Sequence, residues 1–204
     1  MDTRSLIQIP GYRYNEYLLI LDPHEELRNK IQHIKSVFAD KYASQHAQFG
    51  QPQITLVNFV QLEMAEERLV NRLNTIAMGY HPFKVELKDF RSFPTHSLFI
   101  NVESQLQVKN LMKEIKTAQQ LMTLNKDHKP HFIDTPQIPI ARKLQPWQYE
   151  KAWMEYSHLH FTGGFIAESM LLIKRKVGQL KYQVVQRFGF RNLPVATRQG
   201  NLFA

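Results

Sequence analysis

Two short segments of the chain begin with the same three residues and carry side chains that could hold a phosphate group. Residues 52–57 read Pro-Gln-Ile-Thr-Leu-Val, and residues 136–141 read Pro-Gln-Ile-Pro-Ile-Ala, 84 positions further on. The amides of Gln53 and Gln137 donate and accept hydrogen bonds but do not titrate near neutral pH. Together with the Thr55 hydroxyl they can bind phosphate oxygens or base and ribose groups, but they cannot transfer a proton.

Each of these segments is expected to begin a strand that is followed by a helix. Side chains alternate between the two faces of a strand, so Gln53 and Thr55 share one face and Gln137 and Pro139 share another. If the two halves of the chain are related by a pseudo-two-fold axis, both faces look into one cleft. Two unrelated strands that happen to begin with Pro-Gln-Ile would give the same match.

Other reactive constellations are missing from the sequence. The nine histidines are scattered without a His-Glu-x-x-His pattern, and the chain has no cysteine, so we expect no metal and no cofactor. Glycine-rich phosphate loops and the Gly-x-Ser-x-Gly elbow are also absent. His131, six residues before Gln137, is a possible substitute acid or base, although a lone histidine at a strand entrance is more often solvated. Weaker candidates of the same kind are Asp134, His81 and His96.

The elements that must position these residues alternate between strands and helices. Apolar runs and strict alternation predict strands at 17–21, 54–60, 83–87, 97–102 and 138–144. Apolar residues at spacings of three and four predict helices at 23–42, 62–79, 104–122 and 146–156, the first capped by Asp22 with Glu25 and the third by Ser104. Residues 165–188 read as one long hairpin that turns near Gly178, and Gly163-Gly164 suggests a β-bulge.

Composition describes an ordinary globular protein. The 204 residues are 43% hydrophobic and 22% charged, and no linker separates independent domains, so residues 1–204 are expected to form a single α+β domain of two interlocked lobes. Neither a membrane-spanning apolar run nor a signal-peptide centre is present, so we expect no membrane partner. The absence of cysteine fits a reducing compartment, and cytoplasmic localisation is the default. The oligomeric state is not indicated.

Charge is unevenly distributed along the chain. Residues 1–100 hold 11 basic and 11 acidic residues, whereas residues 101–204 hold 15 and 7, so the whole net charge of +8 belongs to the second half. A polyanionic partner such as RNA is plausible, although a basic surface also serves solubility. Arg175 and Lys181 belong to a basic cluster in the terminal hairpin, where such residues equally protect a sheet edge. Phe161, Phe165 and Tyr182 could stack on bases, but such aromatics are usually core.

From about Tyr17 to Phe188 the chain resembles the 2H phosphoesterase superfamily, specifically the bacterial 2′-5′ RNA ligase-like proteins. The resemblance is carried by the two Pro-Gln-Ile segments, by the continuations Thr-Leu-Val-Asn-Phe at 55–59 and Ala-Arg-Lys-Leu at 141–144, and by the aromatic helix at 147–156. It implies a bilobed α+β fold of two pseudo-symmetric halves around a central cleft. In active members each half supplies His-x-Thr or His-x-Ser, and the two imidazoles act as a metal-free acid–base pair on a 2′,3′-cyclic phosphate or a 2′-5′ linkage.

This chain departs from that pattern at three of the four motif positions. Gln53 and Gln137 stand where the family has its imidazoles, Pro139 replaces the second hydroxyl, and only Thr55 matches. The interpretation that follows is a catalytically degenerate member that binds a nucleotide, an RNA end or another phosphorylated ligand through Gln53, Thr55 and Gln137. Two alternatives remain: an active cyclic phosphodiesterase or 2′-5′ RNA ligase that uses non-standard residues such as His131, and an interaction scaffold without a ligand.

Overall fold

The computed structural model describes residues 11–193 of the chain. Its elements follow one another as β1 (Tyr14–Leu21), α1 (Glu25–Lys41), η2 (Gln45–Gln48), β2 (Ile54–Leu62), η3 (Glu63–Ala65), α2 (Glu66–Gly79), β3 (Phe83–Phe93), β4 (Ser97–Val102), α3 (Gln105–Lys116), α4 (Gln119–Met122), β5 (His131–Phe132), β6 (Gln137–Arg142), α5 (Pro146–Tyr156), β7 (Thr162–Ala167), β8 (Ser169–Lys176) and β9 (Gln183–Gly189). The expected α+β class is confirmed. None of the helices in this part of the chain is long and apolar enough to cross a membrane.

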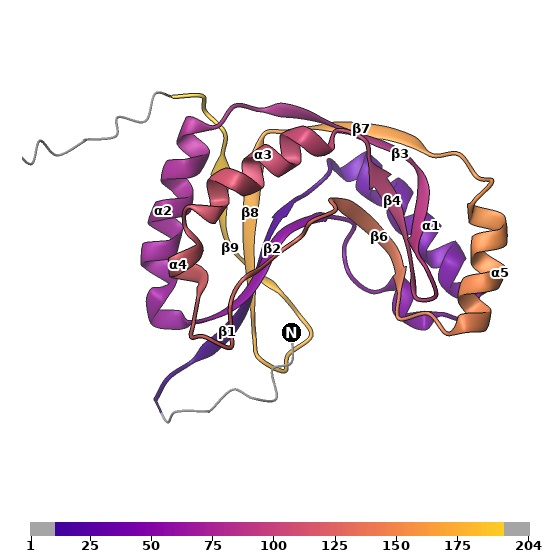
Figure 1. The fold of residues 1–204 in the computed structure, drawn as a ribbon, viewed down its shortest axis with the longest axis horizontal. Coiled ribbons are helices and arrows are strands. Elements are labelled where there is room, and N and C mark those ends of the chain that lie inside the picture. The colour runs from indigo at the N-terminus through magenta and orange to yellow at the C-terminus, as the bar shows by residue number, and fades with distance from the viewer. Residues whose placement is uncertain (1–10, 194–204) are drawn as a thin grey trace, which may run out of the picture.

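The strands form two antiparallel sheets, and each is covered by helices on one face (Figure 1). The first sheet has the order β5-β2-β1-β8-β9, and α2, α3 and α4 pack against it. The second has the order β6-β4-β3-β7, and α1 and α5 pack against it. Helix α1 therefore follows a strand of the first sheet but covers the second, and α3 makes the opposite crossing. These exchanged helices interlock the two lobes.

Burial follows the apolar spacing of the helices. On α1 the side chains of Leu27, Ile31 and Phe38 are buried, as the three- and four-residue spacing predicts. Phe38 packs edge-on against Tyr156 of α5 at 5.4 Å between ring centroids, which joins the two helices over the second sheet. One continuous hydrophobic core contains residues of both sheets. The core therefore fixes the position of each sheet relative to the other.

Both motif strands contain one extra residue at the same place in their register. The residues on either side of Leu56 pair with consecutive residues of β1, so Leu56 has no partner in that ladder. Likewise, the residues on either side of Ile140 pair with consecutive residues of β4. Leu56 and Ile140 are 84 positions apart and both are buried. A matching β-bulge in the two Pro-Gln-Ile segments supports two related halves, because bulges are specific local features.

Both predicted helix caps are wrong. The residue before α1 is His24, and the Asp22 carboxylate instead accepts hydrogen bonds from Arg187 of β9 at 3.0 and 2.7 Å. This bidentate arrangement occupies both carboxylate oxygens, so neither is left for the helix. Ser104 does precede α3, but its hydroxyl accepts a hydrogen bond from the backbone N–H of Glu86 at 2.9 Å. In each case a tertiary contact replaced the local one that the sequence suggested.

The expected long hairpin at 165–188 is divided between the two sheets. Strand β7 pairs with β3 in the second sheet, and the chain then crosses at Glu168 into β8 of the first sheet. Within this segment only β8 and β9 form a hairpin, and the turn between them contains Gly178 with φ of +87°, as expected. The crossing is marked only by Glu168 and Ser169 between two apolar runs, 165–167 and 170–173, and the sequence pattern alone did not separate these runs into two sheets.

The predicted bulge at Gly163-Gly164 is also wrong, because β7 runs in unbroken register along β3. These glycines instead allow close approach. A Cβ atom on Gly164 would lie 3.0 Å from the carbonyl oxygen of Val85, and one on Gly163 would lie 3.1 Å from Cδ1 of Leu27. The irregularity lies in β3 itself, where Asp89 has φ of +56°.

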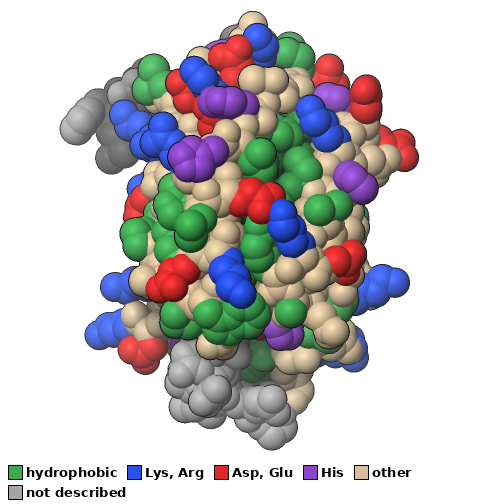
Figure 2. All heavy atoms as spheres, turned by 90° about the vertical axis from the view of Figure 1, so that its right-hand side faces the viewer, with side chains coloured by type: hydrophobic (Ala, Val, Ile, Leu, Met, Phe, Trp, Pro, Cys, Tyr) green, Lys and Arg blue, Asp and Glu red, His purple; other side chains and the backbone are tan. Residues whose placement is uncertain are grey.

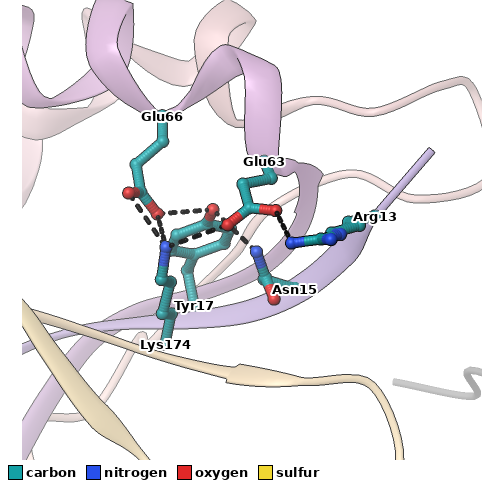
Figure 3. A network of polar contacts seen from close by, with 6 residues as sticks. All are labelled: Arg13, Asn15, Tyr17, Glu63, Glu66 and Lys174. Carbon is teal, nitrogen blue, oxygen red and sulfur yellow. Dashed lines mark hydrogen bonds and ion pairs between the residues drawn. The ribbon is translucent and has the colours of Figure 1, made fainter. Parts of the chain in front are cut away.

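A polar network fastens α2 and η3 to the first sheet (Figure 3). The Tyr17 hydroxyl donates to Glu66 at 2.9 Å, and the Lys174 ammonium donates to the same carboxylate at 2.7 Å. Burial and the neighbouring Glu66 carboxylate raise the pKa of Tyr17. Because strand side chains alternate, the neighbours of Tyr17 and Lys174 on β1 and β8, namely Glu16 and Arg175, point to the opposite face of the sheet. That face borders the cleft.

Candidate ligand-binding cleft

A cleft of about 940 Å³ lies between the two sheets and has the size of an ordinary small-molecule site. Strands β1, β2 and β8 of the first sheet line one side, and the end of β6 lines the other. The segment between α1 and β2 and the tip of the β8–β9 hairpin complete its walls. The cleft is therefore built from both halves of the chain, where the sequence placed it.

Three of the four motif residues line this cleft. Gln53 and Thr55 reach it from the start of β2, and Pro139 reaches it from β6. Gln137 lies two residues before Pro139, is half-buried and is not among the lining residues. Its Oε1 atom is buried without a hydrogen-bond partner, as is Oδ1 of Asn58, a lining residue of β2. Buried acceptors of this kind are uncommon, so each motif strand has an acceptor open to a further donor.

His131 is not among the lining residues. It is exposed on the two-residue edge strand β5, where it pairs in register with Asn58. The imidazole that does line the cleft is His46 of η2, which the sequence did not single out. Its position depends on the fold of the segment between α1 and β2, and no local pattern around it indicates a site.

Positive charge dominates the lining of the cleft. Within residues 11–193 the one acidic lining side chain is Glu16, which accepts a hydrogen bond from Nε of Arg175 at 2.6 Å, so these two charges largely offset each other. The guanidinium of Arg175 also lies 4.6 Å from the ring centre of Tyr182. The other basic lining residues are Lys35, Arg142, Lys143 and Lys181. Several positive side chains facing one hollow favour an anionic ligand.

The basic terminal hairpin is divided between two roles. Arg175 and Lys181 line the cleft, whereas Lys174 lies on the other face of the sheet and pairs with Glu66. Of the three aromatic residues considered for base stacking, Phe161 and Phe165 are buried in the core. Tyr182 lines the cleft and remains a candidate platform.

Lys35 is the most unusual of these side chains because it is only 4% exposed. It projects from α1, and its ammonium donates to the backbone carbonyls of Phe49 at 3.0 Å and Gly50 at 2.5 Å. Burial, with a smaller contribution from the nearby Arg142 guanidinium, lowers the pKa of Lys35 to about 8. Sequence periodicity gave no sign of this residue, since it occupies an apolar position of an otherwise regular helix.

Two other surfaces offer weaker candidates. A shallower hollow of about 650 Å³ beside β7 has mixed charge, and its Lys84 and Glu86 pair with each other at 2.6 Å. Figure 2 shows acidic, basic and histidine side chains intermixed with apolar ones on the face that carries α5. Among residues 11–193, no group of three or more His, Cys, Asp or Glu side chains is placed to hold a metal ion. The cleft is thus the stronger site for a ligand.

Comparison with known proteins agrees with this geometry. Residues 23–179 match the model of the 2′-5′ RNA ligase superfamily. The chain belongs to the 2′-5′ RNA ligase superfamily. The 2H phosphoesterase resemblance drawn from the sequence is thereby confirmed, and Gln53, Thr55 and Pro139 all lie within the matched residues. None of the curated proteins matches the chain.

Solved structures show the same fold at low identity. The apo form of LigT from E. coli has a TM-score of 0.58 and 13% identity, over 87% of this chain and 98% of that one. LigT complexed with 3′-AMP gives 0.57 and 14% over the same shares. TT0787 of Thermus thermophilus gives 0.63 and 15%, over 86% of this chain and 98% of that one. This member of the 2′-5′ RNA ligase superfamily therefore has the α+β fold that the resemblance implied.

Proposed function

We propose that the cleft binds a nucleotide, an RNA end or another phosphorylated ligand, and that the acid–base catalysis of the superfamily has been lost. The observation that carries this is the pairing of Gln53 and Thr55 on one wall with Pro139 on the other, within a predominantly basic cleft. Amide and hydroxyl groups hold phosphate oxygens without titrating. Proline offers neither a hydroxyl nor a backbone N–H donor. Such a lining suits retention of an anion more than its turnover.

The expected loss of activity is large. A positioned general acid or base contributes typically about 10²–10⁴-fold to a rate. If Gln53 and Gln137 stand at the two imidazole positions, both groups are missing, and their effects need not multiply because they act as a unit. LigT has been crystallised with 3′-AMP, phosphate, ATP and NADP+, which supports a phosphorylated ligand for a cleft of this fold.

A second candidate is an active phosphodiesterase that uses a different imidazole. His46 favours it, because this residue lines the cleft together with Gln53. His131 supports it less, since its exposed place on β5 is not among the lining residues. The two functions differ in one observable, which is conversion of the bound ligand.

The experiment uses short fluorescent RNAs ending in a 2′,3′-cyclic phosphate, a 3′-phosphate or a 3′-hydroxyl. Anisotropy measures binding, and the RNA ends are analysed after incubation in the same samples. Phosphate-dependent binding that weakens with added salt, with unchanged ends, is expected. Thr55→Val, which replaces the hydroxyl by a methyl group, should weaken binding several-fold. Conversion that disappears in His46→Ala would establish the second candidate, and no binding to any RNA would leave an interaction scaffold.

A further inference from the structure

Lys35 is a buried basic side chain whose hydrogen-bond partners are backbone carbonyls. Its ammonium is bonded to two backbone carbonyls, and it forms no ion pair with any carboxylate among residues 11–193. An ammonium group has three N–H donors, so one is left once the two carbonyls are satisfied. Lys35 also lines the cleft, which brings its side chain within reach of a molecule bound there.

This arrangement is costly in the empty protein. Buried charges are normally paired, because removal from water is offset only by an opposite charge and by hydrogen bonds. Lys35 instead lies near a second cation, Arg142 at the end of β6, whose charge disfavours the protonated lysine. An anion between the two groups would reverse that repulsion. The two carbonyls belong to the segment that leads into Gln53, so the same lysine also fixes the wall beside that residue.

We propose that Lys35 bonds directly to a phosphate oxygen of the ligand and that it makes the cleft select phosphate monoesters over cyclic phosphodiesters, a role that rests on the function proposed above. A monoester carries about −1.5 to −2 charges at pH 7, whereas a cyclic diester carries one. Two neighbouring cations attract the first more strongly, since Coulomb energy scales with charge. The preferred ligand is thus the product form of the superfamily's phosphodiesterase reaction and not its substrate.

The remaining charged groups that line the cleft do not supply this preference. Glu16 and Arg175 bond to each other across β1 and β8. Lys143 follows β6 and Lys181 belongs to the β8–β9 hairpin, and both are exposed, so solvent and salt screen them. His46 of η2 is exposed as well. Among the basic lining residues in the described part of the chain, Lys35 alone is almost completely buried, and charge-assisted hydrogen bonds are strongest where water is excluded.

The test compares 3′-AMP with 2′,3′-cyclic AMP by calorimetry on the wild type, Lys35→Met and Lys30→Met. Lys30 is a matched control because it lies on the same helix, is exposed and does not line the cleft. The wild type should bind 3′-AMP about tenfold more tightly than the cyclic nucleotide, in keeping with a hydrogen bond to a charged group. Lys35→Met should lose most of this preference, and Lys30→Met should keep it.

Proton uptake on binding of 3′-AMP gives a second readout, which can be measured on the wild type. At pH 8 the phosphate has already lost its second proton, and Lys35 is only partly protonated in the free protein. Binding of 3′-AMP should then take up a fraction of a proton, seen as an enthalpy that depends on the ionisation enthalpy of the buffer. The same titration of Lys35→Met should show no uptake.

Each contrary result separates the two proposals. Equal weakening of both nucleotides in Lys35→Met would mean that the lysine only fixes the wall, and it would overturn the direct contact. A wild type that binds both nucleotides without preference or proton uptake would overturn the inference and leave the proposed function standing. A wild type that binds neither nucleotide would overturn both. Circular dichroism of each variant establishes that it is folded.

Discussion

Replacement of Lys35 by Met should stabilise the ligand-free protein near neutral pH, and the gain should shrink as the pH rises. The pKa of Lys35 falls from 10.5 to about 8 on folding, because burial and Arg142 disfavour its charged form. At pH 7 the folded state therefore carries a penalty of about 3 kcal/mol relative to the neutral amine, at about 1.36 kcal/mol per pKa unit. Loss of the hydrogen bonds to Phe49 and Gly50 offsets part of the gain, by about 1 kcal/mol each.

The pH dependence is more telling than the size of the gain. For a base whose pKa is lower in the folded state, the penalty is fully present below about pH 8 and is relieved as the pH rises toward 10.5. In this window the unfolded chain binds more protons, so wild-type stability rises with pH. Lys35→Met lacks this contribution. Its advantage over the wild type should fall by about 2 kcal/mol between pH 7 and pH 9.5.

Urea unfolding at pH 7.0, 8.5 and 9.5 measures this difference. Other groups that titrate in the range, including tyrosines whose pKa is raised, are common to both proteins and cancel in the comparison. Lys30→Met, on the exposed face of α1, should differ from the wild type by a constant amount. A stability difference for Lys35→Met that does not change with pH would refute the reasoning, because the amine would then be as well solvated in the folded protein as in the unfolded chain.

Three further changes test the fold and the motif. Gly164→Ala should lower the unfolding free energy by about 1–3 kcal/mol, since its Cβ would meet a backbone carbonyl at 3.0 Å, whereas Gly189→Ala meets nothing within 4 Å and should be nearly neutral in thermal melts. Glu66→Gln should lower the free energy of unfolding by about 1–2 kcal/mol in urea, because it removes the negative charge that the Tyr17 and Lys174 donors share. A decrease below about 0.5 kcal/mol would mean that the network drawn in Figure 3 does not stabilise the fold. Restoring the family motif in one triple variant should create measurable hydrolysis of 2′,3′-cyclic nucleotides, and a folded variant without activity would mean that the cleft has also changed shape; the substitutions are Gln53→His, Gln137→His and Pro139→Thr.

Those parts of the fold that depend on local pattern were predictable from the sequence. The buried stripe of α1, the strand positions and the Gly178 turn follow from spacing and from the conformational freedom of glycine. The predictions failed where a residue has both a local and a distant hydrogen-bond partner to choose from. Asp22 and Ser104 have the chemistry of helix caps, yet Arg187 and the backbone of β3 take their oxygens. Such outcomes depend on which strand lies beside which, and the local pattern of residues around Asp22 and Ser104 does not reveal that order.

Some residues of the candidate site were also predictable from the sequence, and others were not. Gln53, Thr55 and Pro139 could be found because they belong to segments that repeat along the chain at a fixed offset and form strands. Lys35 and His46 reach the same cleft from a helix and from the segment after it, with no motif around them. Lys35 even occupies a buried helical position that periodicity assigns to an apolar residue. A residue whose role depends on being buried can be recognised only in the folded structure, where its neighbours are known.

The cleft is proposed to hold a phosphorylated ligand without converting it. The most direct measurement is a titration of the wild-type protein with 2′,3′-cyclic AMP and 3′-AMP, in which binding heat and nucleotide composition are followed in the same samples. We expect saturable binding while the cyclic nucleotide stays intact. Saturable binding with conversion of the cyclic nucleotide to a monoester would contradict the loss of acid–base catalysis, and the absence of binding would contradict the phosphate site.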